Sequence, residues 1–198
     1  MQIKHGINLK KQEMWILIIF FIGGIPGVSL DNKVSLTLIP LLGTASIIWL
    51  LKKEWLAYDF NLLKSGALYV WVGRGITYCI LVQAFFTIIF GLESTSAEKT
   101  SFHYVIMPVY IVTGAILEEI VFRKILLKLS SYPPFWLNAL ISSSIYAAYH
   151  FTLSRFISFL AVGLILCVIY KKSGSIAAPI ITHIVINILG LIAMTLRN

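Results

Sequence analysis

The stretch VIMPVYIVTGAILEEIVFRKILL, residues 105–127, places Glu118 and Glu119 side by side in an otherwise apolar run, with Arg123 four residues after the second glutamate. The run is long enough to cross a hydrocarbon core of about 30 Å as a helix. A charge near the centre of such a helix costs about 2.5 to 3.5 kcal/mol on insertion scales, so acids kept there usually have a function. The stretch therefore predicts a membrane-spanning helix that carries a polar site.

The composition of the whole chain supports the same environment. Hydrophobic residues make up 59% of the 198 residues and charged residues 12%, against roughly 45 to 50% and about 25% in soluble domains. The apolar runs are too long for the short alternating strands of a membrane barrel. We therefore expect an all-α fold, a polytopic transmembrane helical bundle formed by residues 1–198 as a single integral membrane domain.

Apolar runs and their breakers predict about seven spans. The first two are the least regular, because GGIPG at residues 23–27 is expected to kink or end the first and Pro40 to interrupt the second. The predicted spans are Met14 to Leu30, Val34 to Leu51, Ala67 to Leu92, His103 to Leu129, Phe135 to Phe151, Phe156 to Tyr170, and Ile176 to Leu196.

The basic residues predict the orientation in the membrane. The net charge of +8 comes from short clusters between the apolar runs, a pattern that argues against nucleic-acid binding. With the amino end cytoplasmic, ten lysines face inward: Lys4, Lys10, Lys11, Lys52, Lys53, Lys64, Lys124, Lys128, Lys171 and Lys172. Four basic residues then face outward: Lys33, Lys99, Arg155 and Arg197. This bias predicts a multi-pass protein of a bacterial plasma membrane with its amino end inside.

Two acids and two histidines lie deep in apolar sequence: Glu118, Glu119, His150 and His183. They come from three different predicted helices, and carboxylates and imidazoles together are the groups used in acid/base chemistry. Glu119 and Arg123 are spaced i, i+4, so they share one helix face and can form an ion pair. Glu118 points away by about 100°, which makes it the freer carboxylate and the candidate general base.

The same i, i+4 spacing recurs twice more. His183 and Asn187 share one face of the last span, where two donors can hold an oxyanion. Tyr146 and His150 share a face of the fifth span. His150 is expected near the outer end of that span, farther out than Glu118, unless the helix is tilted or begins later, near Asn138.

Structural roles account for other polar residues. A buried Glu–Arg pair or a lone intramembrane His can also simply join helices. Arg74 is interpreted as reaching back to the cytoplasmic headgroups. Ser142, Ser143 and Ser144 are interpreted as small packing residues, and so are Cys79 and Cys167, which lie far apart in separate apolar runs.

These motifs resemble those of the CPBP family, which comprises CAAX proteases and bacteriocin-processing enzymes and is also called the Abi family. The resemblance covers about residues 103–190, which are expected to form the catalytic core. It rests on three motifs: EExxxR at Glu118, Glu119 and Arg123, an aromatic residue four positions before a His at Tyr146 and His150, and HxxxN at His183 and Asn187. The family usually has Phe where this chain has Tyr146.

The resemblance implies an intramembrane glutamic endopeptidase without a cofactor. On that basis Glu118 and His150 activate a water, His183 and Asn187 stabilise the oxyanion, and Arg123 with Glu119 holds the site together. The expected partners are the lipid bilayer and a substrate that is a hydrophobic or lipid-associated peptide or a membrane protein.

Three other functions stay open at this point. A bacteriocin self-immunity or scaffold protein would act by binding, without proteolysis. A zinc metalloprotease is also possible in principle, because two His and a Glu suffice as ligands, but the chain contains no HExxH motif. Buried carboxylates and histidines also occur in proton-coupled transporters, although this chain shows no inverted repeat. The oligomeric state does not follow from the sequence.

Overall fold

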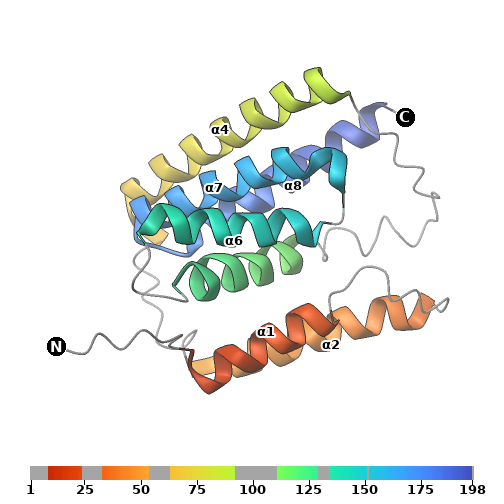
Figure 1. The fold of residues 1–198 in the computed structure, drawn as a ribbon, viewed down its shortest axis with the longest axis vertical. Helices are drawn as coiled ribbons and strands as arrows, with labels where there is room; N and C mark the ends of the chain where they lie inside the picture. The colour runs from red at the N-terminus through yellow and green to blue at the C-terminus, as the bar shows by residue number, and fades with distance from the viewer. Residues whose placement is uncertain are drawn as a thin grey trace.

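The computed structural model describes residues 9–23, 33–53, 63–91, 111–128, 134–150 and 152–197 of the chain. These residues form helices and short connections, and within them no strand occurs. Figure 1 shows the helices as a bundle in which most axes run roughly along one direction. The predicted all-α fold is therefore confirmed.

A described helix lies in each of the seven predicted spans. The helices are α1 (Lys11–Gly23), α2 (Lys33–Leu50), α4 (Gly66–Phe90), α-helical residues 111–119 continued by the π-helix η2 (Ile120–Ile125) and the 3-10 helix η3 (Leu126–Lys128), α6 (Phe135–Tyr149), the 3-10 helix η4 (Leu153–Arg155), α7 (Phe156–Ser173), and α8 (Ala177–Arg197). Helix α2 continues through Pro40, so the expected interruption there is wrong. Residues 24–27 of the GGIPG stretch lie outside the described residues.

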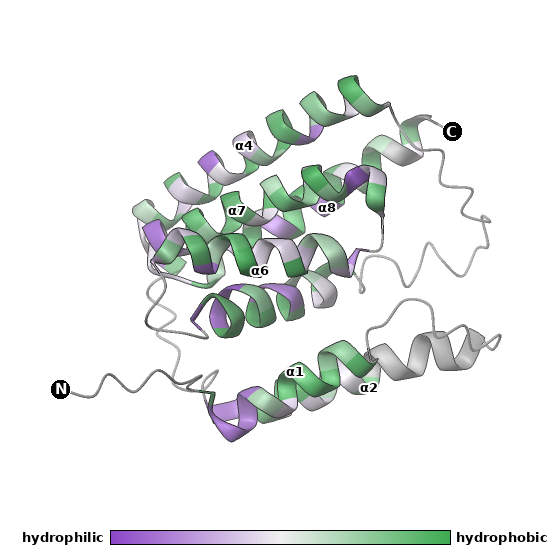
Figure 2. Ribbon diagram, in the orientation of Figure 1, coloured by the Kyte–Doolittle hydropathy of each residue, from purple (hydrophilic) through white to green (hydrophobic). Residues whose placement is uncertain are grey.

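Two described segments are long and apolar enough to cross a bilayer, Gly66–Phe90 and Leu153–Ser173. Only 17% and 28% of their most apolar windows is buried within the protein. A core helix of a soluble protein would be mostly buried, whereas these helices turn apolar side chains outward, and Figure 2 shows apolar residues along them. The chain is a helical membrane protein, and the seven-span count stays a prediction.

Two large packed cores, with a smaller one between η3, α6 and α7, hold the bundle together. One joins α1, α2, η2 and α6 through side chains such as Phe20, Ile47 and Phe122. The other joins α4, α7 and α8 through side chains such as Val72 and Leu166. The polar residues of the predicted site lie on η2 and the helix before it, on α6 and on α8, and η2, α6 and α8 also contribute to these cores.

Glycines allow the closest helix contacts. A Cβ atom on Gly163 of α7 would lie 2.9 Å from Cβ and 3.2 Å from Cα of Ser143 on α6. A Cβ atom on Gly75 of α4 would overlap Ile169 and lie 2.9 Å from Oγ1 of Thr182. Small residues at helix interfaces let backbones approach, which is the usual way in which membrane helices pack.

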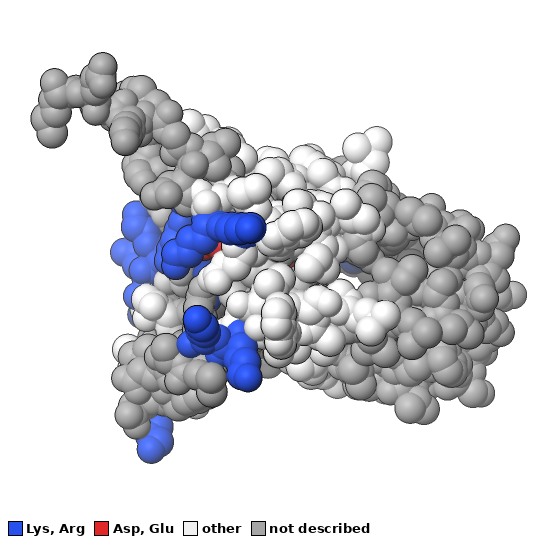
Figure 3. Space-filling model, turned by 90° about the horizontal axis from the view of Figure 1, so that it is seen from below, with Lys and Arg blue, Asp and Glu red and all other residues white. Residues whose placement is uncertain are grey.

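Lysines gather at one end of the bundle. In Figure 1 the starts of α1, α4 and α6 and the ends of α2 and α7 lie at this end, and the ammonium of Lys171 lies 4.0 Å from the ring centre of Phe135. The lysines near these helix ends and on η2 and η3 are Lys10, Lys11, Lys52, Lys53, Lys64, Lys124, Lys128, Lys171 and Lys172. Figure 3 shows most of the visible blue atoms at this end. We call it the lysine end; the grouping agrees with the predicted cytoplasmic side, which stays a prediction.

Candidate active site

The two glutamates lie immediately before a change in helix type. Residues 111–119 are α-helical, and the π-helix η2 begins at Ile120. The wider turn of a π-helix shifts the hydrogen-bond ladder, and such turns are frequent at functional sites. The hydroxyl of Ser142 on α6 donates a hydrogen bond to the carbonyl of Phe122 on η2 at 2.5 Å. This bond fixes η2 against α6.

Glu119 and Arg123 form the predicted ion pair. Nη1 of Arg123 lies 3.1 Å from Oε1 of Glu119, and both side chains are fully buried. The guanidinium also donates from Nη2 to the carbonyl of Gly163 at 3.3 Å and lies 4.6 Å from the ring centre of Tyr146. A buried charge needs such partners to offset its desolvation. The pair therefore anchors η2 to α6 and α7.

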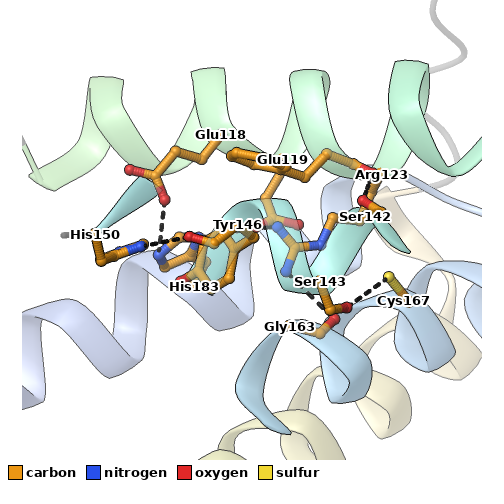
Figure 4. A network of polar contacts seen from close by, with 11 residues as sticks. Glu118, Glu119, Arg123, Ser142, Ser143, Tyr146, His150, Gly163, Cys167 and His183 are labelled. Carbon is orange, nitrogen blue, oxygen red and sulfur yellow. Dashed lines mark hydrogen bonds and ion pairs between the residues drawn. The ribbon is translucent and has the colours of Figure 1, made fainter. Parts of the chain in front are cut away.

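His183 links the two glutamates. Its Nδ1 donates to Oε1 of Glu119 at 2.7 Å, and its Nε2 lies 3.8 Å from Oε2 of Glu118 (Figure 4). A carboxylate only accepts hydrogen bonds, so with Glu119 ionised beside Arg123 the Nδ1 of His183 carries a proton. In the neutral ring Nε2 is then a bare acceptor that faces Glu118.

Glu118 is the least constrained of these groups. Its side chain is 18% exposed, whereas the side chains of Glu119 and Arg123 are fully buried. Its Oε2 atom is nevertheless buried and has no hydrogen-bond partner. An unpaired buried carboxylate oxygen is costly, and such groups in native proteins usually await a ligand, a water or a reaction.

His150 completes the cluster from the end of α6. It is the residue that caps the carboxyl end of α6. The helix begins at Phe135, so the alternative of a later start near Asn138 is wrong. Nδ1 of His150 lies 2.9 Å from the carbonyl of Tyr146, one turn earlier. Because a carbonyl only accepts, Nδ1 carries the proton and Nε2 of the neutral ring is an acceptor. The ring stacks on Phe159 of α7, with centres 4.1 Å apart and planes at 24°.

Asn187 stands apart from this cluster. It lies one turn beyond His183 on α8, is partly exposed, and forms no hydrogen bond with another described residue. The structure thus brings Glu118, His150 and His183 together over the Glu119–Arg123 pair and leaves Asn187 outside direct contact.

The site is closed on the side of the lysine end. The side chains there are nearly or fully buried: Ile125, Leu127, Ala139, Ser143 and Cys167 are at most 7% exposed. On the opposite side, His150 is partly exposed and the residues of η4 are exposed, with Leu153 91% exposed. Accessibility to Glu118 therefore increases away from the lysine end.

Two further features contribute to the site without having been predicted. Gly163 supplies the carbonyl that Arg123 contacts, and Phe159 supports the His150 ring. Neither belongs to a local motif, because each acts through a contact between helices. Among the described ranges, no group of three or more His, Cys, Asp or Glu side chains is arranged to hold a metal ion.

Comparison with known proteins bears on the same region. Residues 100–189 match the family model described as type II CAAX prenyl endopeptidase Rce1-like. A Bacillus subtilis (strain 168) protein named "Putative membrane peptidase YdiL" is 35% identical over 77 residues, which are 38% of this chain and 32% of that protein. Residues 100–189 are therefore similar to the CPBP/CAAX protease family. The resemblance predicted from the three motifs is thereby confirmed.

The CPBP/CAAX match covers the helices that carry the site. The aligned stretch spans about a third of the length of the Bacillus relative. No solved structure matches the chain. The glutamate pair, His150 and His183 all lie within the matched residues.

Proposed function

We propose that the chain is an intramembrane peptidase in which Glu118 activates a water molecule for attack on a peptide carbonyl. The observation that carries the proposal is the buried, unpaired Oε2 of Glu118, 3.8 Å from Nε2 of His183. Oε2 of the ionised carboxylate is an acceptor that lacks a donor. A water lying about 2.8 Å from Oε2 would donate one hydrogen to it, offer its other hydrogen to Nε2 of His150, and keep its lone pairs for attack.

The reaction follows from these protonation states. As the water oxygen bonds to the carbonyl carbon, Glu118 takes one of its protons, and it later returns that proton to the leaving nitrogen when the C–N bond breaks. His150 assists as a second acceptor, because its Nδ1 proton is held by the Tyr146 carbonyl and its Nε2 is free to accept.

His183 serves the oxyanion in its protonated form. Its Nδ1 proton is committed to Glu119, so only the imidazolium also has a donor at Nε2. The Glu119–Arg123 pair fixes the ring that carries this donor, as a carboxylate does for a catalytic histidine in other hydrolases. Asn187 would supply a second donor after turning toward the bound substrate.

The surroundings favour a membrane-associated substrate. The site lies among apolar helices, and on the side away from the lysine end the apolar Leu153 of η4 is exposed. A hydrophobic or lipid-associated peptide, or a segment of a membrane protein, fits such surroundings. The reaction uses water and no cofactor, so we expect activity to withstand a chelator; loss of activity with a chelator and recovery with zinc would favour a metalloprotease instead.

The test compares the peptides of cells that express matched variants. Glu118→Gln keeps the shape of the side chain but removes the base, so one or more precursors should accumulate uncleaved in the membrane or secreted fraction. Glu13→Gln is the matched control, because Glu13 lies at the start of α1 and bonds the backbone of Lys10, outside the site. Processing that continues unchanged in the Glu118→Gln cells contradicts the proposal.

A further inference from the structure

Arg74 is a cation on an outward-facing part of α4. The inward stripe of this helix consists of Leu68, Val72, Gly75 and Cys79, all buried. Arg74 is exposed, as are its neighbours Tyr69 and Tyr78. It lies eight residues, about 12 Å, from the helix start at Gly66. In a membrane this face meets lipid, where an unpaired cation is costly.

A groove runs beside this cation. It has a volume of about 180 Å³ and lies between α4 and α7, two helices that Figure 1 shows side by side. Its walls are apolar apart from Arg74 and the polar tips of two aromatic rings, and no acid lines it. The lining residues are Trp71, Arg74, Tyr78, Leu164, Ile165, Val168 and Ile169.

The guanidinium points toward the lysine end. Its central carbon lies 4.8 Å from the ring centre of Trp71, which stands one turn nearer the helix start. A helical side chain leans in that direction, and an arginine extends its charge toward the nearer headgroups. The groove lies in the same half of the bundle, because Ile169 is four residues from the end of α7 at Ser173.

We propose that this groove binds an anionic phospholipid of the leaflet at the lysine end. One acyl chain would lie along Ile165 and Val168, and the phosphate would pair with Arg74. Arginine binds phosphate through two parallel donors, and anionic lipids concentrate at the cytoplasmic leaflet. The bound phosphate supplies the counter-charge that the walls of the groove lack. The site is separate from Glu118 and does not depend on proteolysis.

Native mass spectrometry of delipidated protein titrated with phosphatidylglycerol tests the site. We expect Arg74→Gln to lower the affinity for the most tightly bound phosphatidylglycerol by about tenfold or more, as for loss of a charge-assisted hydrogen bond. Arg155→Gln is the matched control: Arg155 is also exposed and lies over an aromatic ring, that of Phe159 at 5.8 Å, but lines no part of this groove. The control variant should bind phosphatidylglycerol as the wild type does.

Three further arms separate the parts of the ligand. Phosphatidylcholine, which carries no net charge, should bind more weakly than phosphatidylglycerol, and glycerol phosphate, which has no chains, should not compete. Val168→Trp fills the groove but keeps the charge, and it should also weaken binding of phosphatidylglycerol while the protein stays folded. Equal affinity of wild type and Arg74→Gln, equal affinity for the two lipids, or competition by glycerol phosphate would each overturn the proposal.

Discussion

Replacing Gly163 by alanine should destabilise the bundle at the contact that supports Arg123. The added Cβ would lie 2.9 Å from Cβ and 3.0 Å from Oγ of Ser143, and 3.2 Å from its Cα. The first distance is too short for two carbon atoms, and the backbone atom cannot rotate away. Overpacking of this kind costs about 1 to 3 kcal/mol, and separating α6 from α7 would also stretch the 3.3 Å contact between Arg123 and the Gly163 carbonyl.

The two buried cysteines provide the assay. Cys79 and Cys167 are the only cysteines of the chain, and both are free and fully buried. A thiol-reactive fluorophore should therefore label the detergent-solubilised protein only as it unfolds. For a chain of this size 1 kcal/mol shifts the unfolding temperature by about 2 to 4 °C, so Gly163→Ala should lower it by roughly 2 to 12 °C.

Two further variants make the prediction specific. Gly73→Ala adds the same methyl group to α4, where no atom lies within 4 Å of the new Cβ, and should leave the unfolding temperature nearly unchanged. Ser143→Gly combined with Gly163→Ala moves the small residue to the other helix and should recover part of the loss. An unchanged temperature in Gly163→Ala, or no recovery in the double variant, would refute the packing argument.

Three other predictions concern the charged network and the orientation. Arg123→Met leaves Glu119 buried without its counter-charge and should cost about 3 to 5 kcal/mol in the same assay; a loss below 1 kcal/mol would mean that the pair is dispensable. His183→Ala removes a neutral donor to that carboxylate and should cost less, about 1 to 3 kcal/mol, so a larger loss than in Arg123→Met contradicts the assigned roles. In a cysteine-free background, Leu153→Cys should react with an impermeant maleimide on intact cells and Lys172→Cys only after permeabilisation; the reverse pattern would invert the predicted topology.

Much of the fold follows from local sequence. Long apolar runs such as 67–92 predict helices whatever their neighbours are, because an unpaired backbone cannot lie in hydrocarbon. Proline was the weaker guide: Pro40 does not break α2, since neighbouring groups can satisfy a backbone in a packed bundle.

The site was predictable only where its contacts lie within one helix. The i, i+4 spacing of Glu119 and Arg123 predicts their ion pair because both lie on one helix. The bond between His183 and Glu119 joins residues 64 positions apart, and the stacking of His150 on Phe159 depends on how α6 meets α7. Such contacts depend on helix packing, which periodicity within one segment does not encode. The π-helix after Glu119 likewise has no signal in the residues that form it.

The most direct test of the central claim measures cleavage with Glu118 altered and the fold intact. Once an uncleaved precursor is found in Glu118→Gln cells, the purified wild-type protein and the Glu118→Gln and Glu13→Gln variants can be reconstituted with it, and the fragments can be quantified by mass spectrometry. We predict that wild type and Glu13→Gln release the same fragments and that Glu118→Gln, with an unchanged unfolding temperature, releases none above background. Fragments at the wild-type rate from Glu118→Gln would contradict the role of Glu118 as the base.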